Sequence, residues 1–365
     1  MTPDEVVRHV SHRLSLPTSG ITVERLTGGY VNHVFRVVFG AACGVRAGTP
    51  SVIVKHAPAY VAALPSVALS PRRLEMEARC LRELGPEGQL FDVVSELVRA
   101  PCMIDFDVHA HVLIMEDLGV LPDLAQYALQ GGDLDAHGLQ LGAFVGRLHA
   151  RSRALPQLLR ELDNRDVQEV RQRTQYQQVE QWLGDAGIAD AAVAGARARE
   201  LGQRFLLPGH CLVMGDLWPR SILIDERVLR VIDWELAHAG DPAQDLGHIA
   251  AHLWMQAQRA PTTARAHAID ALHGKIWQGY GAALAALQAA DLLTHQVLRA
   301  ADMHAACEVF ARVLGPFRRG FLYDGLPPDD ASVGCAIECA TRVLVADESR
   351  KATVFFAAET GPQSA

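Results

Sequence analysis

Three short apolar runs in the middle of the chain each end in acidic residues: HCLVMGD at 210–216, SILIDE at 221–226 and LRVIDWE at 229–235. Apolar runs of this length, bounded by polar residues, are typical of short strands that lead into loops. Functional residues concentrate on loops that a rigid scaffold positions. The stretch therefore predicts a small strand-and-loop unit that presents Asp216 and Asp233 at a site.

Asp216 and Asp233 have the chemistry that phosphoryl transfer requires. In this reaction one carboxylate accepts the proton of the attacking hydroxyl and orients it. A second carboxylate binds the Mg²⁺ that neutralises the phosphate oxygens, because hard cations prefer oxygen ligands. The pair therefore indicates a base and a metal ligand.

The same stretch resembles the superfamily of aminoglycoside phosphotransferases, choline kinases and methylthioribose kinases, whose loop reads approximately HGDxxxxN and is followed by a strand and IDxE or IDW. The resemblance implies that Asp216 is the catalytic aspartate and that Asp233 binds magnesium. It places Ser221 at the position of a metal-binding Asn and makes Glu235 an additional metal ligand. Asp245, in DPAQDLGH, matches an aspartate that braces the catalytic loop.

Two positions depart from the family pattern: Met214 stands where His is usual, and Ser221 where Asn is usual. An apolar Met can take over the packing role of the His, whereas a hydroxyl makes a weaker metal contact than an amide oxygen. Methylthioribose kinases are similar in having Ser here and an acidic residue two positions after the metal aspartate, which implies that Asp233 and Glu235 share the metal. The departures leave two other hypotheses open: a pseudokinase that binds nucleotide or ligand without turnover, and a nucleotidyl transferase on the same scaffold.

The N-terminal third has the pattern of an antiparallel sheet accompanied by two helices. The expected elements are a helix at 3–16, strands at 21–26, 33–40 and 51–57, a loop at about 61–71, a helix at 72–84 that ends before Gly85, and a strand within 110–119. Beyond residue 118 the sequence changes to long helices, for example at 139–152 and 193–206.

The apolar strand VIVK at 52–55 resembles the kinase strand whose lysine contacts the α- and β-phosphates, which implies this role for Lys55. Glu77 on the following helix is placed to pair with this lysine. The turn TGGYVNH at 27–33 resembles the nucleotide-covering turn of the family, which implies that Gly28, Gly29 and Asn32 lie against the nucleotide. By itself, a Gly-Gly pair more often marks a simple hairpin turn.

IMEDL at 114–118 matches the family hinge between the lobes, where main-chain groups of Glu116 to Leu118 would bind adenine. The resemblance implies an α+β, protein-kinase-like fold of two lobes, a small antiparallel-sheet N-terminal lobe and a mainly helical C-terminal lobe. We expect the nucleotide-binding lobe at 1–115, the hinge at 116–119, and the helical lobe with catalytic loop and acceptor site at 120–365. We interpret His149, in the motif GRLH, as structural.

Composition narrows the class of protein further. Acidic residues outnumber basic ones, 42 to 34, and the formal net charge of -8 lacks the basic footprint of a nucleic-acid-binding protein. No apolar run approaches the roughly 20 residues that span a bilayer, and the first residues lack the apolar core of a secretory signal. The seven Cys residues form no CxxC pair. We expect a cytoplasmic protein with neither a nucleic-acid nor a membrane partner, and the sequence does not indicate its oligomeric state.

The motifs together predict an enzyme that uses ATP and Mg²⁺ to phosphorylate a hydroxyl of a small molecule. The Ser221 and Glu235 pattern suggests a sugar-like acceptor such as methylthioribose, and an aminoglycoside or another hydroxylated antibiotic is the close alternative. Arginines near the end of the chain would favour an anionic or sugar-like acceptor if they lined the cleft. Arg312, Arg318 and Arg319 are the arginines in question, and their simpler interpretation is a solvated helix end.

Overall fold

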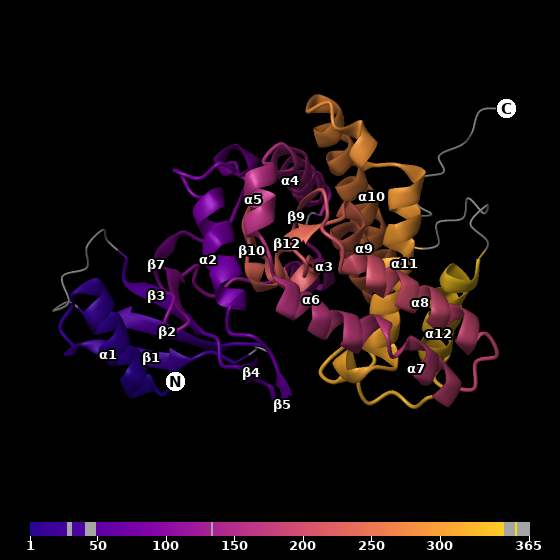
Figure 1. The fold of residues 1–365 in the computed structure, drawn as a ribbon, viewed down its shortest axis with the longest axis horizontal. Helices are drawn as coiled ribbons and strands as arrows, with labels where there is room; N and C mark the ends of the chain where they lie inside the picture. Colours follow the sequence, from indigo (N-terminus) through magenta and orange to yellow (C-terminus); the bar gives the residue numbers. More distant parts are fainter. Residues whose placement is uncertain (28–30, 41–48, 133, 347–354, 356–365) are drawn as a thin grey trace.

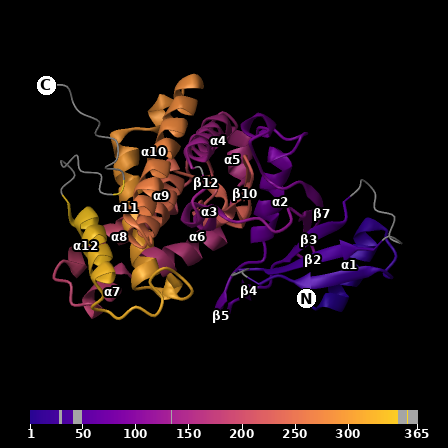
Figure 2. The ribbon, with the colours of Figure 1, turned by 180° about the vertical axis from the view of Figure 1, so that it is seen from behind.

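The structure of the protein is a computed structural model that describes residues 1–27, 31–40, 49–132, 134–346 and 355. The chain begins with α1 (Pro3–Leu14), whose first turn is closed by a capping box: the Thr2 hydroxyl accepts a hydrogen bond from the Glu5 amide, and the Glu5 carboxylate accepts one from the Thr2 amide. These bonds satisfy two donors that no helical carbonyl reaches. Figures 1 and 2 show α1 and the sheet after it at one end of the molecule and the long C-terminal helices at the other.

A five-stranded sheet follows α1, in the order β1 (Ile21–Arg25), β2 (His33–Phe39), β3 (Ser51–His56), β8 (Val112–Glu116) and β7 (Met103–Asp107). Each neighbouring pair is antiparallel, as the sequence predicts. Side chains of β3 alternate between two apolar clusters: Val52 and Val54 pack with α1, and Ile53 packs with α2 (Arg73–Leu84). By the same alternation Lys55 lies on the α2 side of the sheet.

The segment expected to be a loop at about 61–71 contains a short hairpin instead, formed by β4 (Tyr60–Val61) and β5 (Leu64–Ala68). This expectation was wrong because Pro65 and the lack of clear alternation hide a strand. A two-stranded hairpin tolerates Pro, since only one edge of each strand needs its amides.

Short strands between the helices position the acidic loops. β9 (Cys211–Val213) pairs antiparallel with β12 (His238–Gly240), and β10 (Ile222–Asp225) pairs antiparallel with β11 (Val228–Val231). β6 (Val98–Arg99), from the first part of the sequence, joins β11 as a parallel neighbour. Asp216 therefore follows β9 and Asp233 follows β11, in agreement with the apolar runs.

Helices form most of the remaining described chain: α3 (Leu124–Gln130), α4 (Asp135–Arg153), α5 (Pro156–Glu161), α6 (Arg165–Arg171), α7 (Val179–Asp185), α8 (Ala191–Phe205), α9 (Pro242–Gln258), α10 (Thr263–Ala286), α11 (His295–Val313) and α12 (Ala331–Val345). Their apolar faces share one core that also reaches under α2. Of the helices within the described residues, none combines the length and apolarity needed to cross a membrane.

Glycines let α4 and α10 approach closely. Gly138, Gly142 and Gly146 recur every four residues on α4, a spacing that places them on one face. A Cβ atom at Gly142 would lie 1.9 Å from the carbonyl oxygen of Ile276 on α10. A larger residue there would force the two helices apart.

Candidate active site

Lys55 occupies the centre of a buried ion-pair cluster between the sheet and α2. Its Nζ lies 2.7 Å from Oε1 of Glu77 and 2.5 Å from Oδ1 of Asp233, and its side chain is 5% exposed. Burial by itself would lower the pKa of Lys55, but the carboxylates of Asp233 and Glu77 raise it overall, so the lysine stays charged. The ion pair between Lys55 and Glu77 that the sequence predicts is present.

Asp233 reaches Lys55 from a tight turn. The residue has φ 65° and ψ 61°, in the left-handed region that Asp tolerates better than most residues. The turn is held by Trp234, whose indole Nε1 donates to the carbonyl of Val231 at 3.0 Å. The Asp233 side chain is 37% exposed, more than any other side chain bonded to Lys55. One carboxylate thus contacts the lysine and the solvent at once.

Glu235 is held by two partners on the N-terminal side. Nδ2 of Asn32 donates to Oε2 of Glu235 at 2.5 Å, and Nε of Arg73 lies 3.4 Å from the same oxygen. Oδ1 of Asn32 in turn accepts from Nε of Arg73 at 3.1 Å. Burial raises the pKa of Glu235 to about 7, against the opposing attraction of Lys55. The Asn32 side chain therefore bridges Glu235 and Arg73 through one hydrogen bond to each.

These residues form what we call the lysine cluster: Lys55, Arg73, Glu77, Asp233 and Glu235. When its three carboxylates are ionised, they face two cations, so the cluster carries one net negative charge. A buried excess of negative charge on oxygen ligands suits a hard cation.

The loop that carries Asp216 is fixed by Asp245 of α9. Its carboxylate accepts hydrogen bonds from the amides of Met214 at 2.7 Å and Gly215 at 2.9 Å, and Nε2 of His149 lies 3.3 Å away. These bonds hold the pKa of Asp245 below its ordinary value despite burial, which by itself would raise it. Asp245 braces the loop and His149 is structural, as the sequence predicts.

Ser221 is fully buried and bonded within its own loop. Its hydroxyl lies 2.9 Å from the carbonyl of Trp218 and 3.2 Å from that of Asp216, and it accepts from the Trp218 amide at 3.3 Å. The hydroxyl therefore closes the turn after the catalytic loop. Its role as a metal ligand stays a prediction.

Asp216 itself is 24% exposed at the side chain, and its Oδ1 lies 3.5 Å from Nε2 of His248 on α9. Burial raises the pKa of Asp216 above its ordinary value, and nearby His248 and Arg171 oppose this shift. A carboxylate with a raised pKa accepts a proton more readily than an exposed one.

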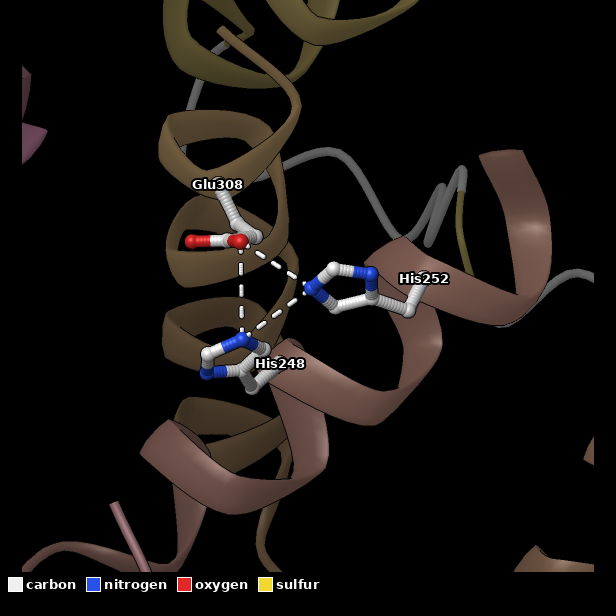
Figure 3. Close-up of side chains that lie close together, drawn as sticks. All are labelled: His248, His252 and Glu308. Atoms are coloured by element: carbon white, nitrogen blue, oxygen red, sulfur yellow. Dashed lines mark hydrogen bonds and ion pairs between the residues drawn. The ribbon is translucent and has the colours of Figure 1, made fainter. Parts of the chain in front are cut away.

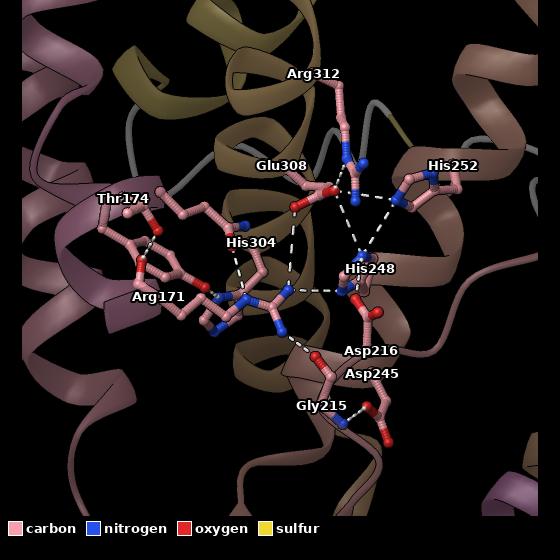
Figure 4. A network of polar contacts seen from close by, with 12 residues as sticks. Arg171, Thr174, Gly215, Asp216, Asp245, His248, His252, His304, Glu308 and Arg312 are labelled. Atoms are coloured by element: carbon pink, nitrogen blue, oxygen red, sulfur yellow. Dashed lines mark hydrogen bonds and ion pairs between the residues drawn. The ribbon is translucent and has the colours of Figure 1, made fainter. Parts of the chain in front are cut away.

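Behind Asp216 lies a second buried group, the histidine cluster, in which α6, α9 and α11 meet (Figure 4). It consists of Arg171, His248, His252, Glu308 and Arg312. Oε1 of Glu308 lies 2.6 Å from Nε of Arg312, 3.0 Å from Nε2 of His252 and 3.4 Å from Nε2 of His248. Burial would raise the pKa of Glu308, but the charge of Arg312 and the hydrogen bonds from His248 and His252 hold it well below its ordinary value. Glu308 is therefore ionised and contacts Arg312, His252 and His248 with one carboxylate oxygen.

The two imidazoles and Glu308 point their ligand atoms at one another, as a metal site would (Figure 3). Their hydrogen-bond partners oppose this interpretation. Nη2 of Arg171 lies 2.6 Å from Nδ1 of His248, and because a guanidinium only donates, Nδ1 must accept. A neutral His248 then carries its proton on Nε2, the atom that would have to bind the metal. Moreover, Arg171 and Arg312 already balance Glu308 and Asp216, so a divalent cation would leave two buried charges uncompensated.

The predicted hinge at the end of β8 is fixed through its side chains. Asp117 accepts hydrogen bonds from Arg36 at 2.7 Å and 3.1 Å and from the Ser51 hydroxyl at 2.7 Å. The Glu116 carboxylate accepts one from the Cys102 amide at 3.0 Å. The Glu116 amide already donates to the carbonyl of Cys102 at 2.9 Å. Adenine binding by the main chain of Glu116 to Leu118 stays a prediction. Gly28 and Gly29, predicted to contact the nucleotide, lie outside the described residues.

Comparison with known proteins identifies the family. Residues 22–293 match the model of the phosphotransferase enzyme family. The chain belongs to this family. It is therefore a phosphotransferase that acts on a hydroxyl group of a small molecule, and the family resemblance found from the motifs is confirmed.

Relatives of this phosphotransferase include the 4-hydroxytryptamine kinase of Psilocybe cyanescens, 26% identical over 280 residues that cover 70% of this chain and 74% of that protein. The methylthioribose kinase of Pectobacterium atrosepticum is 25% identical over 316 residues, 80% of this chain and 76% of that one. A solved structure of glucosamine kinase has a TM-score of 0.51 at 16% identity and covers 94% of this chain and 82% of its own. The predicted kinase-like fold is thereby confirmed.

The structure of this phosphotransferase brings the predicted residues into two groups. Asn32, Lys55, Glu77, Asp233 and Glu235 meet between the sheet and α2, whereas Asp216 and Ser221 lie on the loop beside the histidine cluster.

Sequence reasoning missed Arg73, Arg171, His248 and Glu308. Arg73 lies next to Arg72 at the start of an ordinary helix pattern, and only its complete burial distinguishes it. The HxxxH spacing of His248 and His252 on α9 was the one local signal for the histidine cluster.

Proposed function

We propose that this phosphotransferase is an active kinase that transfers the γ-phosphoryl group of ATP to a hydroxyl of a small molecule, with Asp216 as the base and Asp233 as the magnesium ligand. The observation that carries the proposal is the position of Lys55 between Glu77 and Asp233. A lysine fixed by a helix carboxylate beside a partly exposed aspartate is the arrangement that kinases use to hold phosphates and metal.

The lysine cluster fits ATP and Mg²⁺ by charge and by chemistry. Its oxygen donors, and its negative charge when all three carboxylates are ionised, suit the cation, and Mg²⁺ would neutralise charge on the transferred phosphate. Lys55 would turn from Asp233 towards the α- and β-phosphates while Glu77 keeps it oriented. Asp233 carries the metal contact in this proposal because its side chain is the most open. Glu235 and Ser221 remain predicted ligands, each now bonded to neighbouring protein groups.

Asp216 would orient the acceptor hydroxyl and accept its proton as the new bond to phosphorus forms. Its raised pKa serves the second role, and its 24% exposure lets an acceptor reach it. The two bonds from loop amides to Asp245 keep the loop that carries Asp216 in one conformation. Positioning of this kind supplies much of the catalysis in phosphoryl transfer.

The remaining predictions complete the proposal. We propose a nucleotide lobe at 1–115, a hinge at 116–119 whose main chain binds adenine, and a lobe at 120–365 that contains the acceptor site. Relatives named as kinases of hydroxytryptamine and methylthioribose support a small hydroxylated acceptor. A glucosamine kinase solved with ADP supports ATP as the donor. A sugar-like metabolite remains the first acceptor to test, followed by an aminoglycoside.

The departures at Met214 and Ser221 favour the alternative of a pseudokinase, and one experiment separates the two. ATP binding is measured by calorimetry with and without Mg²⁺ for the wild type, for Asp233→Asn, and for Asp185→Asn, an exposed aspartate on α7 that serves as control. We expect Mg²⁺-dependent binding that only Asp233→Asn weakens. ADP release with an acceptor panel then follows, and its loss in Asp216→Asn supports an active kinase. Binding of ATP without any ADP release would favour the pseudokinase, and no nucleotide binding would refute the proposal.

A further inference from the structure

An aromatic pair lies beside the loop that carries Asp216. The ring of Trp218, two residues after Asp216, stacks on Phe321 with 5.4 Å between centroids and 21° between planes. His252 of the histidine cluster packs against both rings, at 5.2 Å and 5.7 Å between centroids. The aromatic pair and Asp216 therefore both contact the histidine cluster, the pair through His252 and Asp216 through His248. Trp218 and Phe321 are both partly exposed, so the pair forms part of an accessible wall.

Two guanidinium groups lie against this one aromatic pair. Cζ of Arg312 is 4.1 Å from the ring centroid of Phe321 and 5.2 Å from that of Trp218. Cζ of Arg220 is 4.9 Å and 5.6 Å from the same two centroids. Stacking on aromatic faces holds an arginine in place and leaves the edge of its guanidinium free to donate hydrogen bonds.

The nearby carboxylates do not neutralise both arginines. Glu308 accepts from Nε of Arg312 and balances one of the two positive charges. Within the part of the chain that the structure describes, Arg220 has no ion-pair partner. Asp324, on the same loop as Phe321, turns its carboxylate to the amide of Gly320 at 2.8 Å. The wall thus presents positive charge and hydrogen-bond donors beside the loop that carries Asp216.

We propose that Arg220 and Arg312 bind an anionic group of the acceptor, a carboxylate or a phosphate, while Trp218 and Phe321 pack against its planar or apolar part. This inference rests on the proposed function, since it assigns the acceptor of that same site. Planar guanidinium groups bind such anions through paired, charge-assisted hydrogen bonds. Two like charges on one aromatic pair repel each other, and a bound anion removes this repulsion.

The same charges discriminate against cationic acceptors. An aminoglycoside carries several ammonium groups, and each would meet Arg220 and Arg312 without a free carboxylate in compensation. The other two arginines that the sequence suggested do not join this wall. Arg318 donates to the carbonyls of Tyr323 and Leu326, and Arg319 is exposed. Arg312 alone of that group therefore belongs to the proposed acceptor site.

Three phenols that share one ring test the proposal: 4-hydroxyphenylacetate carries an anion, tyrosol a neutral hydroxyl and tyramine a cation. Each is titrated by calorimetry into the full chain saturated with Mg²⁺ and the ATP analogue AMP-PNP. The variants are Arg220→Gln and Arg312→Gln, and Arg319→Gln is the matched control. Arg220→Gln removes an exposed side chain, so it tests the proposal even where Arg312→Gln disturbs the fold.

We expect the acid to bind the wild type and the Arg319→Gln control about tenfold or more tightly than the amine, with tyrosol between them. The preference should shrink in Arg220→Gln and vanish in Arg312→Gln. Equal or tighter binding of tyramine, a preference that survives in both variants, or no binding of the acid to the wild type overturns the proposal.

A separate measurement excludes the transferred phosphate as the anion. If the arginines bind the transferred phosphate, both variants will bind AMP-PNP more weakly than the wild type and ADP equally well. That result also overturns the proposal. Failure of AMP-PNP to bind the wild type refutes the proposed function instead. The acid is then titrated into the chain alone, which still decides whether Arg220 and Arg312 bind an anion.

Discussion

The lysine cluster and the histidine cluster are both buried and both charged, yet their charges are balanced differently. In the lysine cluster three carboxylates face Lys55 and Arg73, which leaves one negative charge in excess when all three are ionised. In the histidine cluster Arg171 and Arg312 balance Glu308 and the adjoining carboxylate of Asp216. The first cluster is therefore suited to receive a cation, and the second is complete without one. Ligand-like geometry is present in both, so charge balance is what distinguishes them.

The largest expected effect is on the rate of phosphoryl transfer, when Asp216 beside the histidine cluster is substituted. Asp216→Asn keeps the shape of the side chain but cannot accept the hydroxyl proton, so the rate of ADP release should fall by a factor of about 10² to 10⁴. Affinity for ATP and Mg²⁺, set by the lysine cluster, should stay within about twofold of the wild type. An unchanged rate of ADP release in Asp216→Asn would show that Asp216 is not the base. Loss of ATP binding in this variant would show that Asp216 and the lysine cluster do not act independently.

The next prediction compares one carboxylate from each cluster. Glu308→Gln removes the buried carboxylate charge and leaves the partly buried Arg312 and Arg171 poorly compensated, so the free energy of unfolding should fall by about 3–5 kcal/mol. Glu77→Gln should cost less, about 1–2 kcal/mol, because Lys55 keeps its pair with Asp233. Urea unfolding of both variants measures the difference. Equal losses would contradict the assigned charge balance.

The pH dependence of stability tests the neutral state of His252. Burial lowers the pKa of His252 to about 3, whereas an unfolded histidine titrates near 6.5. Between these values the unfolded chain binds the extra proton, so the contribution of this residue to stability falls as the pH drops below about 6.5, by up to about 1.4 kcal/mol per pH unit. Glu308, with its lowered pKa, adds a further loss only at more acidic pH.

His252→Gln should flatten the curve of unfolding free energy against pH between about 6.5 and 4.5, and His109→Gln on an exposed turn should not. Urea unfolding at several pH values gives both curves. An unchanged slope in His252→Gln would mean that His252 is protonated in the folded protein.

The smallest expected effect is none. Zn²⁺ added to the full chain should not bind at one equivalent to the histidine cluster or raise the midpoint of thermal unfolding, because Arg171 fixes the proton of His248 on Nε2. Calorimetry of the wild type and His248→Gln is the measurement. One equivalent of Zn²⁺ that binds the wild type and is lost in His248→Gln would contradict the assigned tautomer and charge balance.

The two clusters also differ in how far the sequence could predict them. Lys55 and Glu77 follow from a strand that ends in Lys and a helix register, both local patterns, and their ion pair is present. Arg171, His248 and Glu308 lie on three helices, and only packing brings them together. The helical pattern beyond residue 118 predicts helices in this part of the chain but not which of their faces meet.

Local patterns failed elsewhere for related reasons. The β4–β5 hairpin was hidden by Pro65 in a segment without alternation. Arg73 looked like a surface residue of a helix, yet it is fully buried and donates to carbonyls of the hairpin region as well as to Asn32. The roles of Asp216, Ser221 and Asp233 in catalysis and metal binding stay predictions that the experiments above decide.

The pairing of β6 with β11 has a consequence for any attempt to divide the protein. Val98 and Arg99 belong to the proposed nucleotide lobe by sequence, but they supply the third strand beside the strand that leads to Asp233. A fragment that starts at residue 120 would expose the bare edge of β11, and such edges recruit other chains. We therefore expect the isolated helical fragment to aggregate, and its recovery as a soluble partner when residues 1–119 are co-expressed in trans.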